Sequence, residues 1–252
     1  MKSLRRNKIL ISASLAALVA ISSAQEAPFI AVHGPHNLED ALREHGVTDQ
    51  SEQSLISALQ DSNQQVRGMA ANKLAADGDQ DAIPAIVTTL SNEQDLQTQS
   101  QLAQALWVLH DPRGVEHLHS MCMNAQLPMH GLLSAVRTLQ IIRVSTGECA
   151  DTFIAAMSRK NESGEIGMAV SMLPVMYREV SPSQARVIFA VIPALFADTK
   201  QEPVVRHLAG QALSQIRTPE AAELLRRQIP LETDDTLRRS FQQDLGKLEK
   251  EH

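Results

Sequence analysis

Aromatic residues are scarce in this sequence, which has five Phe, one Trp and one Tyr in 252 positions. Sandwiches and barrels of β-strands depend on aromatic and β-branched side chains, so the composition disfavours both folds. The hydrophobic fraction of 43% excludes a wholly disordered chain and is sufficient to build a core. Helices are therefore the expected secondary structure.

Basic residues are also few, with 23 Lys and Arg against 29 Asp and Glu. Four of the 23 lie in the first 24 positions, which hold no acidic residue, so the rest of the chain has 19 basic and 29 acidic residues and a net charge of −10. Nucleic-acid binding needs a basic surface that neutralises phosphates. We therefore expect no nucleic-acid partner.

The chain has no apolar run of membrane-spanning length. The run at residues 9–21 has thirteen residues, whereas a helix needs about 20 to cross a hydrocarbon core of about 30 Å. It follows a basic segment and precedes small residues at Ser22 and Ala24, as in a secretory signal peptide. We predict a signal peptide at residues 1–24, a linker at residues 25–36, and an exported protein, periplasmic or extracellular, with no membrane insertion after cleavage. Retention of residues 1–24 as an anchor is the alternative.

An internal repeat of about 33 residues fills the rest of the chain. Six copies start at residues 66, 98, 131, 165, 205 and 237. Four residues after each start the side chain is apolar, and eight residues after each start it is always Leu; these offsets form one buried stripe on a helix. Six residues after each start the side chain is polar and is expected to face solvent. That polar column consists of Asn72, Gln104, Arg137, Ser171, Gln211 and Gln243.

Each of these helices is followed by a short turn and a second apolar-periodic segment. Asp79, Asp111 and Thr218 stand where an N-cap is needed, and Pro112 and Pro219 stand at the first helical position. One helical hairpin cannot bury its own apolar stripe, so the hairpins must stack. The sequence predicts an all-α solenoid of about six hairpins over residues 37–250, forming one domain, with an N-terminal capping helix from Leu38 that ends at Gly46.

The repeat resembles HEAT repeats, in particular the short HEAT-like repeats of the phycobilisome lyase type. The resemblance rests on V-R at the start of the first helix, A-x-x-x-L within it, and D-P-x-[AG]-V after it. It is close in the copies at 66, 98 and 205 and looser in the other three. It implies an armadillo-type superhelix, most often a protein-binding scaffold. It also implies a ladder of ion pairs, in which an acidic residue in the turn before the helix meets the Arg that follows Val. Asp61 with Arg67 and Glu232 with Arg238 fit this pattern. Lys200, which stands in the acidic position before Arg206, would break the ladder there.

Motifs for catalysis are missing. The resemblance extends to bilin lyases and a di-iron hydroxylase, but the hydroxylase would need recurring His-Glu pairs, and the sequence has no His-Glu dipeptide. A nucleophile elbow, a glycine-rich phosphate loop and an HExxH segment are also missing. We therefore predict a protein that is not an enzyme and has no cofactor; a lyase-type enzyme rests on family analogy alone.

A cluster of soft ligands between His110 and His130 suggests an alternative function, the handling of copper or zinc in the periplasm. His119 and Cys122 share a helix face there, although Met and Cys at such spacing more often fill a core. For the second cysteine, Cys149, the repeat register predicts an offset from Cys122 of six residues, or about 9 Å at about 1.5 Å per residue. A bridge needs Cα atoms within about 7 Å, so we expect two buried free thiols and no disulfide.

The array surface is the remaining candidate site. In the two central copies, Leu133 and Met168 add apolar side chains beside the polar column, and an exposed Met-rich patch is typical of adaptable peptide binding. The alternative is that these side chains are buried against neighbouring repeats. We predict an exported, non-catalytic scaffold that binds a protein or peptide on its concave face through Asn72, Gln104, Leu133, Arg137, Met168, Ser171, Gln211 and Gln243.

Overall fold

The computed structural model describes residues 38–159 and 161–250. The predicted signal peptide and linker lie outside the described residues. The described chain consists of helices and three short 3-10 turns, with no strand. It begins with α2 (Leu38–Glu44) and continues as six pairs of helices. The first helices of the pairs are α3 (Glu52–Ala58), α5 (Ile83–Asn92), α7 (Arg113–Met123), α9 (Ala150–Met157), α11 (Pro182–Ala197) and α13 (Pro219–Gln228). The second helices are α4 (Gln64–Asp77), α6 (Leu96–Val108), α8 (Met129–Ile141), α10 (Ser163–Glu179), α12 (Pro203–Ile216) and α14 (Asp235–Lys250).

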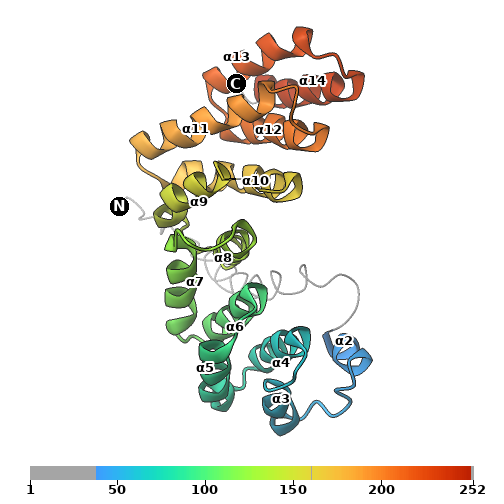
Figure 1. The fold of residues 1–252 in the computed structure, drawn as a ribbon, viewed down its shortest axis with the longest axis vertical. Helices are drawn as coiled ribbons and strands as arrows, with labels where there is room; N and C mark the ends of the chain where they lie inside the picture. The colour runs from blue at the N-terminus through green and yellow to red at the C-terminus, as the bar shows by residue number, and fades with distance from the viewer. Residues whose placement is uncertain (1–37, 160, 251–252) are drawn as a thin grey trace, which may run out of the picture.

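The six pairs stack along the long axis of the molecule, from α2 and α3 at one end to α13 and α14 at the other (Figure 1). Each second helix packs against the second helices of the neighbouring pairs, and α2 packs on α4. In Figure 1 the helices α5, α7, α9 and α11 lie on the opposite side of the stack from α6, α8, α10 and α12. We call these two layers the outer and inner helices. The predicted α-solenoid of six hairpins with a capping helix is confirmed.

The repeated leucines and small residues hold the stack together. The apolar residue four after each start has no exposed surface in any of the six inner helices. Five of the six column leucines are equally buried, and Leu245 in the last helix is half-buried. Because Ala fills four of the six positions in the first column, neighbouring helices approach closely, and few aromatic side chains are needed to fill the interior.

A left-handed residue follows α2 and the inner helices α4, α6, α8 and α12, whereas α10 ends on the extended Val180. Gly46, Gly78, His110, Arg143 and Arg217 all have positive φ, between 58° and 89°, and the first four are spaced 32 or 33 residues apart. This conformation ends a helix and turns the chain toward the next outer helix. Glycine adopts it without steric cost, whereas His and Arg do not. The repeat therefore ends on a defined backbone turn rather than on a defined residue type.

Buried ion pairs connect successive repeats near both ends of the array. Arg67 donates to both carboxylate oxygens of Glu93 at 2.7 and 2.8 Å, and Arg206 pairs with Glu232, which is also 26 residues further on. The predicted ladder is therefore wrong in its partners. Arg67 reaches the backbone carbonyl of Asp61, not its carboxylate, and Arg238 likewise donates to the carbonyl of Glu232. The carboxylate comes from the turn before the next inner helix, so Arg206 is paired despite Lys200.

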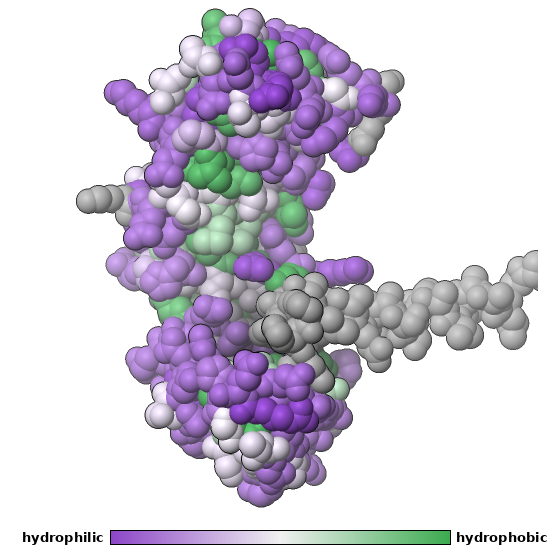
Figure 2. Space-filling model, turned by 90° about the vertical axis from the view of Figure 1, so that its right-hand side faces the viewer, coloured by the Kyte–Doolittle hydropathy of each residue, from purple (hydrophilic) through white to green (hydrophobic). Residues whose placement is uncertain are grey.

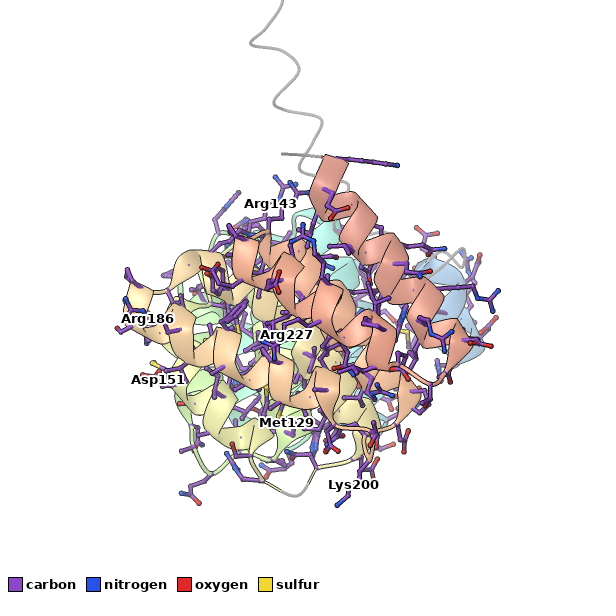
Figure 3. The ribbon with its side chains drawn as sticks, turned by 90° about the horizontal axis from the view of Figure 1, so that it is seen from above. Met129, Arg143, Asp151, Arg186, Lys200 and Arg227 are labelled. Carbon is purple, nitrogen blue, oxygen red and sulfur yellow. A yellow bond between two sulfur atoms is a disulfide. The ribbon has the colours of Figure 1, made fainter. Side chains whose placement is uncertain are left out.

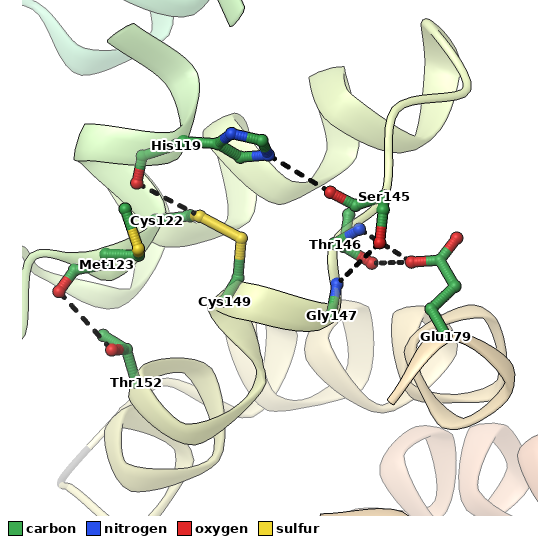
Figure 4. Close-up of a disulfide and its surroundings, with 9 residues drawn as sticks. All are labelled: His119, Cys122, Met123, Ser145, Thr146, Gly147, Cys149, Thr152 and Glu179. Carbon is green, nitrogen blue, oxygen red and sulfur yellow. Dashed lines mark hydrogen bonds between the residues drawn. A yellow bond between two sulfur atoms is a disulfide. The ribbon is translucent and has the colours of Figure 1, made fainter. Parts of the chain in front are cut away.

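The two cysteines form a disulfide, which corrects the expectation of free thiols (Figure 4). Their Cα atoms are 5.3 Å apart. The expected offset assumed that α7 and α9 begin in the same register. Cys149 instead belongs to a 3-10 turn (Gly147–Cys149) that precedes α9 and packs on α7. Glu179 fixes this turn by accepting hydrogen bonds from the backbone N–H and the hydroxyl of Thr146, both at 2.7 Å.

Candidate partner-binding surface on the inner helices

The inner helices pack in a constant register. A Cβ added to Gly68 would contact Gln101 of the next inner helix, and one added to Gly167 would contact Leu208. His207 hydrogen-bonds Ser240 at 2.8 Å in the same relation. The residue two positions after the start of one copy therefore contacts the residue three positions after the start of the next copy. Positions at two after a start are interfaces between repeats, and they do not face the groove.

Four positions per inner helix point toward the open face, at one before and three, six and ten after each start, and of these only Met69, Asn72 and Gln104 are buried. They recur at helical spacing and form continuous rows along the array, which we call the inner rows. The inner rows are Gln65, Met69, Asn72 and Ala76; Gln97, Gln101, Gln104 and Val108; His130, Ser134, Arg137 and Ile141; Gly164, Met168, Ser171 and Val175; Val204, Leu208, Gln211 and Gln215; and Thr236, Ser240, Gln243 and Lys247.

Three of the predicted binding residues are not accessible. Asn72, Gln104 and Leu133 are buried. Leu133 is two positions after the start of its repeat copy, so its side chain points at α10 and not into the groove. Asn72 and Gln104 belong to the inner rows, on α4, which packs between α2 and α6, and on α6, which packs between α4 and α8. The alternative of burial against neighbouring repeats holds for Leu133, and the expectation that Asn72 and Gln104 face solvent is wrong.

The other predicted residues lie on the open face. Arg137, Met168, Ser171 and Gln243 are exposed, and Gln211 is half-buried. The residues sequence reasoning missed are Val204, Leu208 and Val175. A comparison of the position one before each start would have found Val204, because the other copies have Gln, His, Gly or Thr there.

Apolar side chains gather in the middle of the open face. Met168 is 46% exposed and Val204 is 51% exposed. The half-buried Leu208 follows Val204 by one turn and packs against Gly167 next to Met168, and the half-buried Val175 lies two turns after Met168 on α10. We call these four residues the central patch. Figure 2, which views this side of the molecule, shows apolar colour over the middle of the array between hydrophilic ends.

A polar recess adjoins the central patch toward the C-terminal end of the array. It has a volume of about 260 Å³ and is lined by Gln211, Ser214, Gln215, Arg217 and Lys247. His207 contacts both Gln211 and Ser240 beside it. The open face therefore combines an apolar centre with amide, hydroxyl and basic groups on α12 and α14.

The proposed soft-ligand site is not assembled. The sulfur of Cys122 is bonded to Cys149, so it is not a thiolate ligand, and the Nε2 atom of His119 faces the carbonyl of Ser145 at 3.2 Å (Figure 4). His117 points to Gln99 on α6, and burial lowers its pKa. Across the described residues, no three His, Cys, Asp or Glu side chains are placed to hold a metal ion. The His119 and Cys122 prediction is therefore wrong.

The fold and the open inner surface define a helical repeat scaffold. Residues 52–127 match the family model for HEAT repeats, in agreement with the repeat pattern in the sequence. No curated protein matched the chain. A solved structure of human deoxyhypusine hydroxylase in complex with glycerol is similar, with 15% identity and a TM-score of 0.41, over 94% of this chain and 99% of that one.

This comparison contradicts the prediction that the protein is not an enzyme, because deoxyhypusine hydroxylase is one. At this identity and TM-score the similarity assigns no reaction to the chain. Within the part of the chain that the structure describes, no helix is both long and apolar enough to cross a membrane.

Proposed function

We propose that the protein is a scaffold that binds a segment of a partner protein on its inner helices, centred on the central patch. The observation that carries this proposal is the exposure of Met168 and Val204 in adjacent inner helices. Apolar side chains on an open face are typical of interaction sites, and a methionine adapts to different partners. HEAT repeats, which the chain contains, suggest the same use.

The test is to replace both side chains by aspartate and measure retention of the partner. Met168→Asp with Val204→Asp is expected to abolish capture of proteins from the envelope fraction by the immobilised protein. The matched control is Met123→Asp with Val187→Asp, since these residues are 47% and 51% exposed on the outer helices α7 and α11. Equal loss in both double variants, at unchanged helical content, contradicts a site on the inner face.

We also propose that this scaffold is exported. The basic segment, apolar run and small residues of the first 24 positions support export. The disulfide gives independent support, since disulfides persist mainly in oxidising compartments. N-terminal sequencing of the protein from its native source is expected to begin at Gln25. Recovery of the intact N-terminus in the cytosolic fraction would contradict export.

A further inference from the structure

The inner rows have no acidic residue. None of their 24 positions holds Asp or Glu, although the chain has 29 of these in 252 residues and about three would be expected by chance. The charged residues of the inner rows are Arg137 and Lys247. His130, which is 66% exposed, lies with its Nδ1 atom 3.9 Å from the carboxylate of Glu165 on α10. The binding face therefore differs in charge from the rest of this acidic protein.

Arg137 adjoins the central patch. It stands six after its start on α8, so the register places it beside Met172 and near Met168 on α10, and Gln140 one turn later donates to the carbonyl of Met172. Arg137 is exposed and forms no hydrogen bond or ion pair with another described residue. By contrast, Lys247 is paired with Asp244 at 2.9 Å. Arg137 is thus a cation at the edge of an apolar surface with its charge unneutralised.

A second free cation lies at the other side of the same patch. Arg178 follows Val175 by one turn on α10, is exposed, and also has no partner among the described residues. Glu165 forms a capping box with Glu162 at the N-terminal end of this helix, and Glu179 at its C-terminal end accepts hydrogen bonds from Thr146. The surface offered to a ligand is apolar in the centre, with the cations Arg137 of α8 and Arg178 of α10 at its edges.

We propose that the partner segment is acidic and apolar, with leucine-like side chains on the central patch and a carboxylate at Arg137. This inference rests on the proposed function and specifies its partner. Charge complementarity supports it, because an unpaired cation beside an apolar patch gains most from an anion that is desolvated together with it. The negative net charge of the whole protein repels acidic ligands, so a preference for them must come from the local surface.

Three fluorescein-labelled octapeptides test this proposal by fluorescence anisotropy. All have four leucines, and the other four residues are glutamate in the first peptide, glutamine in the second and lysine in the third. The glutamate peptide is expected to bind about fivefold more tightly than the glutamine peptide, the ratio for one partly exposed ion pair. The lysine peptide is expected to bind most weakly. Equal affinity for all three, or no binding at about 1 mM, overturns the proposal.

Variants identify the residue that provides the preference. Arg137→Gln is expected to reduce the glutamate over glutamine affinity ratio to below about twofold. Arg186→Gln is the matched control, because Arg186 is an exposed arginine on the outer helix α11, at the outer margin in Figure 3. An equal effect of both variants would show long-range attraction only and overturn the assignment to Arg137.

The failure of this inference can be distinguished from failure of the proposed function. If Met168→Asp with Val204→Asp weakens all three peptides but Arg137→Gln changes no ratio, the central patch binds partners and the acidic preference is wrong. If the Met168 and Val204 variant binds every peptide as the wild type does, both proposals fall. Far-UV circular dichroism of each variant checks that the helices are retained.

Discussion

The buried ion pair between Arg67 and Glu93 gives the most direct test of how the repeats are held together. The Glu93 side chain is 1% exposed and accepts two hydrogen bonds from Arg67. Its Oε1 atom also accepts the backbone N–H groups of Gln94 and Asp95 at 2.8 and 2.9 Å. Glu93→Ala removes all four interactions and leaves a guanidinium without its anion at the joint between α4 and α6.

We expect Glu93→Ala to lower the free energy of unfolding by about 3 kcal/mol. Loss of one partner of a buried pair costs about 3 to 5 kcal/mol, and the lower end applies because 19% of the Arg67 side chain remains exposed. Urea unfolding followed by circular dichroism measures the change. The control is Arg226→Ala, whose pair with Glu249 is about half exposed on both sides and should contribute only about 0.2 to 1 kcal/mol. Equal costs for the two variants would refute the reasoning.

The same carboxylate makes the stability depend on pH. Burial by itself raises the pKa of Glu93, but the hydrogen bonds from Arg67, Asp95 and Gln94 outweigh it and hold the pKa below the ordinary value. A lowered folded-state pKa adds stability that is complete above the unfolded pKa, near 4.5, and is lost as the pH falls through the folded value. The difference in unfolding free energy between wild type and Glu93→Gln should therefore shrink as the pH falls from 7 to 3. A constant difference would exclude this linkage.

Three further predictions concern the covalent and backbone features of the stack. Cys122→Ala with Cys149→Ala should cost about 3.5 kcal/mol of unfolding free energy, from the closure entropy of a loop with sequence separation 27; alkylation of the unreduced, unfolded wild type should add no mass. Gly114→Ala should destabilise by at least about 1 to 3 kcal/mol, because its Cβ would clash with the Ala103 carbonyl of α6. The control Gly246→Ala has open space and should stabilise by about 0.5 to 1 kcal/mol. Arg143→Gly should be about 1 kcal/mol more stable than Arg143→Ala in urea, because φ is +58° there; the usual opposite order would show that the turn is not left-handed.

The repeated columns predicted most of the fold. Leucine at eight residues and an apolar residue at four residues after each start require a buried helical stripe. The turn residues Asp79, Asp111 and Thr218 were predicted as N-caps. Thr218 accepts the N–H of Ala221 in this role, whereas Asp79 makes no such bond. The helical stripe and the Thr218 cap could be predicted because a helix and its hairpin turn depend on residues close together in sequence.

Three-dimensional packing decided most of the candidate site. The sequence separated polar from apolar positions, but it did not show that Asn72 and Gln104 would be covered by neighbouring helices. It grouped Leu133 with Met168, although one lies between two repeats and the other on the open face. Which side chain is accessible depends on how closely two helices approach and in what register, and no single repeat contains that information.

The sequence by itself determined an acidic, all-α repeat protein with few aromatic residues, because periodicity and composition act on each hairpin separately. Only the tertiary structure decided that Cys122 meets Cys149, that Arg67 pairs with Glu93, and that Met168 and Val204 are exposed on the inner helices. The two pairs join residues 27 and 26 positions apart, so these relations arise only when the repeats stack.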